Sequence, residues 1–170
     1  SLMFSAQNTL PFKQGEHLNY TIFFGPLQVG SAQLDINEIK KKKNKTAFYV
    51  SGKGRTAFFF DIFFKVRDSY ESYIDTETLL PLEFLRDVHE GGHEIYQNYK
   101  FYHLKNHVST QSKITKRKRN KIIKNDSTYL LSYQSHDMLS AFFYARTFEK
   151  PEISGEKNFY IPIFMDEEEY

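Results

Sequence analysis

Apolar and polar residues alternate along most of the chain, which is the pattern of β-strands that bury one face. The clearest run covers residues 66–74. One side of this strand would carry Val66, Asp68, Tyr70, Ser72 and Ile74, and the other Arg67, Ser69, Glu71 and Tyr73. Aromatic and β-branched residues at this spacing favour a strand. A buried Asp needs hydrogen bonds or a cation, so we expect a partner for Asp68.

The same alternation predicts eight further strands, at residues 16–24, 27–39, 47–54, 82–90, 93–103, 107–115, 121–131 and 159–164. Residues 16–24 should be half-buried, because Leu18, Tyr20, Ile22 and Phe24 share a face. Gly91-Gly92 predicts a two-residue hairpin with positive φ at both positions. The lysine-rich stretch 40–45 should form a solvated hairpin tip, since clustered lysines avoid burial.

Two stretches depart from the alternation. Residues 135–148 carry apolar positions at three- and four-residue spacing, which predicts an amphipathic helix with Ser135 as its N-cap and Asp137 in its first turn; Pro151 and Gly155 should end it. The apolar run 56–64 fits one or two helical turns that plug the end of a sheet. Many short strands with one late helix predict an antiparallel barrel or sandwich.

Composition narrows the class of protein. The 170 residues suffice for one domain with a real core, and 17% of them are aromatic. A net charge of +2 argues against general nucleic-acid binding, and the absence of Cys excludes disulfides and thiolate chemistry. No stretch approaches the roughly 20 apolar residues of a membrane span. We expect an irregular lead at residues 1–14, with Ser1-Leu2 consistent with a vector remnant. One β-rich domain should follow at residues 15–170, with the natural chain continuing past Tyr170.

The motifs do not converge on a catalytic site. His89-Glu90-Gly91-Gly92-His93 matches a zinc-protease pattern, but that chemistry needs a helix and two glycines oppose one. Cross-strand pairing of His89 with Glu94 and of Glu90 with His93 is the better interpretation. Ser135-His136-Asp137 are adjacent, and adjacency does not produce the geometry of a triad. We therefore expect no catalytic residue, no metal and no cofactor.

Charged residues suggest two further interpretations. The basic segment 113–124 is best explained as a solvated hairpin, with contact to anionic lipid headgroups or glycans as the alternative. Arg67 and Arg86 are candidate partners for nearby acids. The residues that we expect to form a polar network, structural or functional, are Arg67, Asp68, Glu71, Arg86, Asp137 and Arg146.

Four segments carry a family resemblance, and they occur in a fixed order: Gly15-Glu16-x-Leu18-x-Tyr20; residues 66–75; Pro81-x-x-Phe84-x-Arg86 with Glu90-Gly91-Gly92; and residues 137–146. With them the chain, over about residues 12–170, resembles an uncharacterised family of exported bacterial proteins, a domain of unknown function. The resemblance implies a YmcC-like fold, which is an antiparallel half-open barrel or curved sandwich with one or two short helices. It also implies export to the periplasm or cell envelope, with a signal sequence that this chain does not contain.

These observations favour a non-catalytic envelope protein that binds a hydrophobic or amphipathic ligand or an assembly partner. The candidate ligand-contacting residues are Tyr20, Phe24, Tyr70 and Tyr73. The expected partners are a lipid, a glycolipid or an envelope protein, and not nucleic acid. A hydrolase or metal-dependent enzyme built on Asp68, Arg67, Glu71 or the His89 cluster is one alternative. A structural scaffold is the other.

Overall fold

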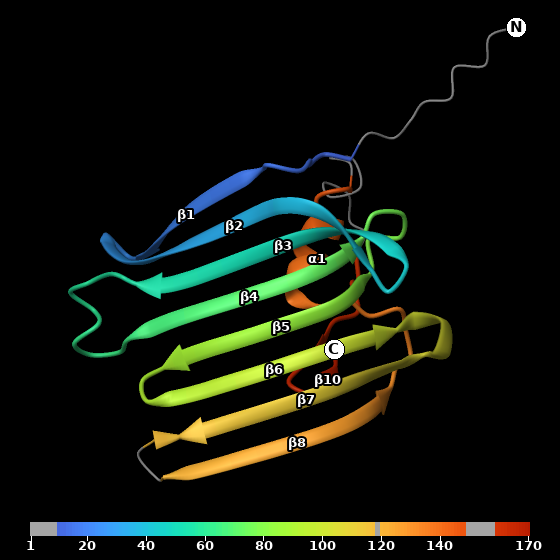
Figure 1. The fold of residues 1–170 in the computed structure, drawn as a ribbon. Coiled ribbons are helices and arrows are strands. Elements are labelled where there is room, and N and C mark those ends of the chain that lie inside the picture. Colours follow the sequence, from blue (N-terminus) through green and yellow to red (C-terminus); the bar gives the residue numbers. More distant parts are fainter. Residues whose placement is uncertain (1–9, 118–119, 149–158) are drawn as a thin grey trace, which may run out of the picture.

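The protein is built on one open antiparallel sheet of eight strands, whose spatial order is the order of the sequence (Figure 1). The computed structural model describes residues 10–117, 120–148 and 159–170. The strands are β1 (His17–Phe24), β2 (Leu27–Lys42), β3 (Lys45–Thr56), β4 (Val66–Asp75), β5 (Pro81–Glu90), β6 (His93–Tyr102), β7 (His107–Lys116) and β8 (Lys121–Leu130). The predicted mainly β, antiparallel fold is confirmed. The sheet is curved and does not close into a barrel.

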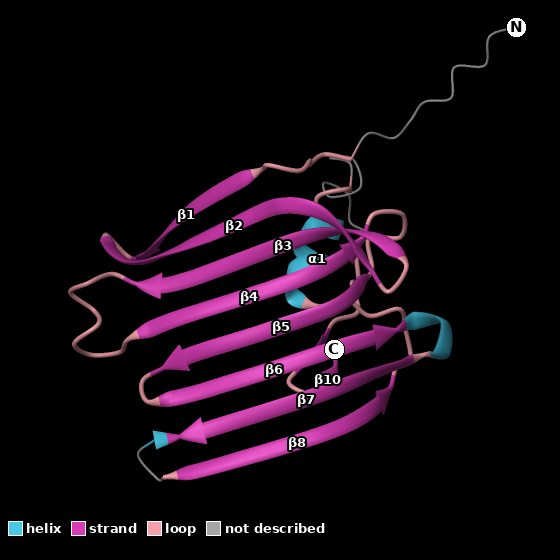
Figure 2. Ribbon diagram, viewed as in Figure 1, coloured by secondary structure: helices cyan, strands magenta, loops and turns pink. Residues whose placement is uncertain are grey.

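The two faces of the sheet have different partners. Residues that lie opposite one another on neighbouring strands share a face, and the row across the middle of the sheet runs through Ile36, Val50, Ser72, Phe84 and Tyr99. All five are buried. We call this side the helix-bearing face, because helix α1 (Met138–Ala145) packs on it against β3 and β4. Figure 2 shows the helix behind the sheet, with the other side, the opposite face, toward the viewer.

Helix α1 begins two residues later than expected. Its N-cap is Asp137, whose carboxylate accepts hydrogen bonds from the backbone N–H groups of Leu139 and Ser140, both at 2.8 Å. The prediction of Ser135 as N-cap is wrong, because the Ser135 hydroxyl instead donates to the carboxylate of Glu169. The predicted helix terminators, Pro151 and Gly155, lie outside the described residues.

The C-terminal segment completes the cover of the helix-bearing face. The strand predicted at residues 159–164 is wrong; the segment forms only a small hairpin of β9 (Phe164–Met165) and β10 (Glu168–Glu169). Phe164 is buried, with its ring 5.3 Å from that of Tyr99 and 5.7 Å from that of Tyr129. Glu167 binds the side chains of β7 and β8 residues, at 2.9 Å each for Ser112, Asn125 and Tyr129. Alternation does not record these long-range contacts.

The described part of the N-terminal lead, residues 10–14, forms no helix or strand and contributes to the core. Phe12 is buried between Phe48 and Phe143, with ring centroids 5.7 and 5.1 Å away. The backbone N–H of Gly15 donates to the carbonyl of Ile36 at 2.8 Å. Strand β1, in contrast, is less buried than predicted. It is an edge strand and mostly exposed, so its predicted half-buried state is wrong.

The predicted turn is confirmed at the β5–β6 hairpin, and the predictions for the β2–β3 hairpin and the β3–β4 loop are only partly correct. Gly91 and Gly92 both have positive φ and join β5 to β6 directly, as expected. The lysine tip between β2 and β3 is a hairpin. The run at 56–64 is a series of turns between β3 and β4 and not a helix, and it projects from the sheet instead of plugging it. A short 3-10 helix, η1 (His103–Lys105), links β6 to β7.

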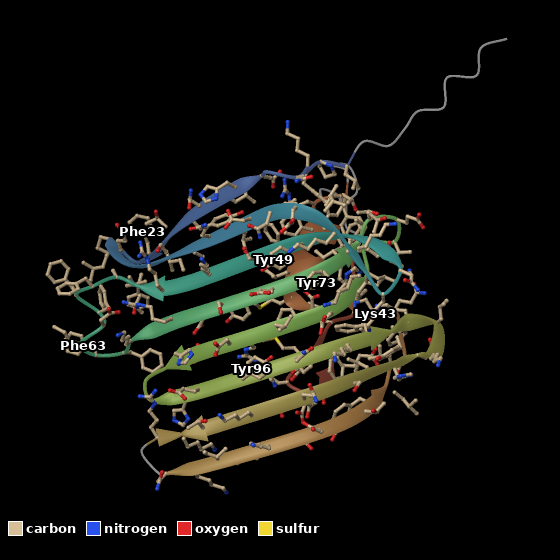
Figure 3. All side chains as sticks on the ribbon, viewed as in Figure 1. Phe23, Lys43, Tyr49, Phe63, Tyr73 and Tyr96 are labelled. Atoms are coloured by element: carbon tan, nitrogen blue, oxygen red, sulfur yellow. The ribbon has the colours of Figure 1, made fainter. Side chains whose placement is uncertain are left out.

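The lysines of the β2–β3 hairpin fold over the opposite face and are not simply solvated. Lys40 lies 4.4 Å from the ring centre of Tyr49, Lys42 lies 4.1 Å from that of Tyr73, and Lys43 lies 4.1 Å from that of Tyr102 (Figure 3). Such cation–π contacts hold an ammonium over an aromatic face. Burial lowers the pKa of Lys43. Lys43 stays exposed and Lys40 and Lys42 stay half-buried, so the tip lies at the surface as predicted, and the sequence does not show the tyrosines of other strands that these lysines contact.

Candidate functional site

An apolar groove of about 400 Å³ lies on the helix-bearing face, at the end of the sheet that α1 leaves uncovered. Its floor comes from β3 and β4, and its walls come from β1, β2 and the β3–β4 loop. The lining is mostly aliphatic and aromatic: Ile22, Val29, Phe60, Phe63, Phe64, Val66 and Tyr70, with Arg55, Thr56 and Asp68 as polar members. Grooves of this size and composition are typical of small-molecule sites.

The groove is open because the strand residue Gly54 has no side chain to fill it. A Cβ atom placed on Gly54, in the middle of β3, would meet only the Cβ of Asp68, at 3.9 Å, so the space above Gly54 is open. Its neighbour along the strand, Gly52, has a different role. A Cβ there would lie 3.2 Å from a methyl group of Leu139, so this glycine lets α1 approach the sheet. A glycine inside a strand often marks such close approach or open space.

The β3–β4 loop is held in place as the outer wall of the groove. Asp61 binds the guanidinium of Arg67, with Nη1 3.0 Å from Oδ1, and accepts a hydrogen bond from the Thr56 hydroxyl at 2.5 Å. The hydrogen bond from Arg67 lowers the pKa of Asp61. Backbone bonds from Phe60 to Ala57 and from Phe64 to Phe60 form successive turns within the loop. The backbone of the loop is therefore held in a defined path.

Polar groups gather on the floor of the groove. Asp68 accepts hydrogen bonds from the Tyr70 hydroxyl, at 3.3 Å, and from the backbone N–H of His89, at 3.2 Å. Burial, and then the Asp68 carboxylate, raise the pKa of Tyr70 to about 12, so the phenol keeps its proton at neutral pH. Burial also raises the pKa of the neighbouring Glu90, with Asp68 adding to the effect. The groove thus offers the Asp68 carboxylate as an acceptor beside an apolar surface.

The four aromatic residues predicted to contact ligand do not share a surface. Tyr70 lies in the groove and separates it from the core. Tyr20 is exposed on β1, and Phe24 is exposed at the β1–β2 turn. Tyr73 points to the opposite face, where its ring stacks on Tyr49 at 5.1 Å. Tyr70 and Tyr73 are three positions apart, so strand alternation puts them on different faces.

The six predicted polar residues form separate interactions and not one network. Arg67 binds Asp61, Asp68 binds Tyr70 and His89, and Glu71 faces Tyr49. The other three bind distant segments. Arg86 donates to Asp166 at 2.7 Å and to Gln97 at 3.2 Å, Asp137 accepts from Ser72 at 2.6 Å, and Arg146 pairs with Glu16. Of the six, only Asp68 lines the groove.

Several groove residues were not identified from the sequence, among them Ile22, Gly54, Phe60 and Phe64. Two signals could have found them. The unbroken apolar run at 58–64 is out of place in a surface loop, and Gly52 and Gly54 interrupt the side of β3 that also carries Phe48 and Val50. Together they point to an apolar loop beside an empty strip of sheet.

The His-Glu-x-x-His motif lies on a hairpin. His89 is opposite Glu94 and Glu90 is opposite His93, as predicted. His89 contacts Asp87 at 3.0 Å and Glu94 at 3.7 Å. Within the described ranges 10–117, 120–148 and 159–170, no three His, Cys, Asp or Glu side chains are grouped to hold a metal ion. In the same ranges, no helix has the length and hydropathy needed to cross a membrane.

His136 is buried beneath α1, where its Nδ1 lies 3.2 Å from the Ser140 hydroxyl and its ring stacks on Tyr144. Burial lowers the pKa of His136 to about 4. The unfolded chain takes up a proton near pH 6.5 and the folded chain does not. The stabilising contribution of neutral His136 is therefore complete above pH 6.5 and is lost as the pH falls toward 4.

When the pH is lowered from 7 to 5, we expect the free energy of unfolding of His136→Gln to rise by roughly 2 kcal/mol relative to that of the wild type, because the variant lacks this titration. The comparison with the wild type matters, since burial raises the pKa of the adjacent Asp137 to about 6 and gives the opposite pH dependence. Urea unfolding at both pH values measures the difference. A constant gap between the two proteins would contradict the assignment.

The comparisons with known proteins identify the family of the chain but not its activity. No curated protein and no solved structure matched it. One family matched residues 19–170, which include all eight strands of the sheet except the first two residues of β1, together with α1 and the C-terminal hairpin. The family is described as a protein of unknown function (DUF3108), and the resemblance to an uncharacterised family is thereby confirmed. This chain belongs to the DUF3108 family.

Proposed function

We propose that this protein is a non-catalytic, envelope-associated binding protein whose groove takes an amphipathic ligand. The observation that carries the proposal is the apolar groove on the uncovered end of the helix-bearing face. An apolar hollow with a few convergent polar groups is the usual form of a ligand site. The resemblance to exported proteins supports a place in the periplasm or cell envelope.

The chemistry of the groove suggests the form of the ligand. The walls contributed by Ile22, Phe60 and Phe64 suit an alkyl or ring system. Asp68 on the floor is a hydrogen-bond acceptor, which suits a head that donates, such as a hydroxyl or an amine. Arg55 also lines the groove, but its Nε atom donates to Ser31, which lies opposite it on β2. A ligand with an apolar body and a donating polar head fits these groups.

The first test fills the groove. Gly54→Leu places a side chain in open space at a position without positive φ, so the fold should accept it. Replacing a glycine within a strand should also add roughly 0.5–1 kcal/mol of stability. We expect solvent extracts of the wild type, purified from its native envelope, to hold a stoichiometric amphiphile by mass spectrometry. We expect the Gly54→Leu extract to hold at least tenfold less.

The matched control is Ser69→Leu, which adds similar bulk to β4 on the opposite face and should retain the wild-type amount. Urea unfolding shows whether each variant is folded. An empty wild-type extract would reject the proposal. Full retention of the amphiphile by Gly54→Leu would show that any bound molecule occupies another site.

A further inference from the structure

Exposed apolar side chains gather at one end of the sheet, on two neighbouring turns. In the β3–β4 loop, Phe58, Phe59, Ile62 and Phe63 are 80%, 78%, 81% and 84% exposed. The β1–β2 turn adds Phe23, Phe24 and Leu27, all more than half exposed. Figure 3 shows Phe23 and Phe63 projecting from the same end. We call these seven residues the aromatic tip. A cluster of this extent on a protein surface usually marks an interaction site.

The aromatic tip is held outward by its own loop. Asp61, bound to Thr56 and Arg67, fixes the base of the β3–β4 loop. The backbone N–H groups of Phe63 and Phe64 donate to the carbonyl of Phe60, at 3.0 and 2.9 Å, which keeps the chain in tight turns. The loop therefore presents its phenylalanines instead of folding them back onto the sheet.

Basic residues share this end of the sheet with the aromatic tip. Lys65 is the last residue of the β3–β4 loop, and Lys116 and Lys121 face each other where β7 ends and β8 begins, farther along the sheet. Arg117 lines the same hollow as Phe63 and Lys65, next to the β5–β6 turn. Two of the nearby acids are already paired, Asp61 with Arg67 and Glu94 with Arg117. These two pairs also neutralise Arg67 and Arg117, which leaves Lys65, Lys116 and Lys121 against Glu90, so the described residues at this end of the sheet carry a net positive charge.

We propose that the aromatic tip docks on a lipid bilayer that carries anionic headgroups. Phenylalanines on two turns would enter the boundary between headgroups and acyl chains, while the surrounding lysines bind lipid phosphates. The arrangement fits a bilayer better than a second copy of the chain, because two copies meeting at the tip would bring like charges together. This inference goes beyond the groove and stands whether or not the groove holds a ligand.

Vesicle flotation tests the docking. We expect the wild type to float with vesicles of phosphatidylcholine and phosphatidylglycerol at 7:3 and to bind pure phosphatidylcholine at least tenfold more weakly. Phe58→Ala/Phe59→Ala/Ile62→Ala should reduce binding to the anionic vesicles at least tenfold. These three residues lie outside the groove lining, so loss of docking is separable from loss of ligand. Lys116→Gln/Lys121→Gln should weaken binding severalfold and reduce its sensitivity to salt.

The opposite end of the sheet provides the control. Leu104, in η1, is 99% exposed, and Leu104→Ala should leave vesicle binding unchanged. The chain contains no Trp, so one introduced Trp reports its own surroundings. We expect the emission of Phe59→Trp to shift to the blue when anionic vesicles are added, and that of Leu104→Trp to stay constant.

Three results would overturn the docking. The first is wild-type protein that stays with the solvent phase at every lipid composition. The second is an equal loss of binding in Leu104→Ala and in the loop variant. The third is a dimer, seen by analytical ultracentrifugation, that the loop variant dissociates while vesicle binding is absent. That result would assign the aromatic tip to a second copy of the chain.

Discussion

Replacing Phe164 with alanine is expected to lower the free energy of unfolding by about 3–5 kcal/mol, the usual cost of truncating a fully buried phenylalanine. The ring is 2% exposed and packs edge-on against Tyr99 and Phe101. The side chain also fixes the C-terminal hairpin over β6–β8, so its loss removes packing on both sides. Urea unfolding followed by circular dichroism measures the change.

The matched control for this prediction is Phe24→Ala, which removes the same ring from the exposed β1–β2 turn. Its cost should stay within about 0.5 kcal/mol, as for most surface substitutions. If Phe164→Ala cost no more than Phe24→Ala, the C-terminal hairpin would not be a structural part of the cover.

Asp137→Ala is expected to cost about 3 kcal/mol at pH 7. The substitution removes the N-cap of α1, which is typically worth about 1 kcal/mol. It also leaves the buried Ser72 hydroxyl without the carboxylate that now accepts its hydrogen bond at 2.6 Å. An unsatisfied buried polar group adds about 1–3 kcal/mol. Thermal and urea unfolding at pH 7 give the magnitude.

Asp137→Asn separates the hydrogen bonds from the charge. Asparagine caps helices about as well as aspartate, and its amide can still reach Ser72, so we expect a loss below about 1 kcal/mol at pH 7. Burial raises the pKa of Asp137 to about 6, so the wild type should lose stability relative to the Asn variant as the pH rises from 4 to 6, and because both proteins keep His136 its opposite contribution cancels in the comparison. Equal losses for Ala and Asn would contradict the capping role.

Sequence reasoning recovers the sheet because its rules are local. Strand β4 was expected at residues 66–74 and runs from Val66 to Asp75, since alternation and flanking turns determine both ends. The Gly91-Gly92 hairpin follows from the φ angles that only glycine adopts readily. The segments that cover the helix-bearing face of the sheet were mostly not predicted from the sequence. Phe12 and Phe164 are isolated aromatics in irregular segments, and nothing near them in sequence indicates what they contact.

The groove was predicted even less well than the cover. Tyr70 was identified, but Tyr73 was grouped with it although alternation places the two on opposite faces. Arg67 was named as a candidate partner for nearby acids, but the sequence did not indicate which one, and it binds Asp61 in the loop. Gly54 contributes because it has no side chain, and the sequence does not show whether the space beside a glycine is open or filled by a neighbour. Such a site is visible only when distant strands are placed side by side.

The strictly sequential order of the strands has a consequence for synthesis of the chain. Every strand pairs with the strand made just before it, so the sheet can form hairpin by hairpin as the chain leaves the ribosome. Apart from Phe12, its cover follows later: Asp137, Phe143 and Phe164 come after Leu130, the last residue of the sheet. We expect the nascent protein to pass through a stage in which Val50, Phe84 and Tyr99 are exposed, and in which a chaperone that binds apolar sheet surface would recognise it.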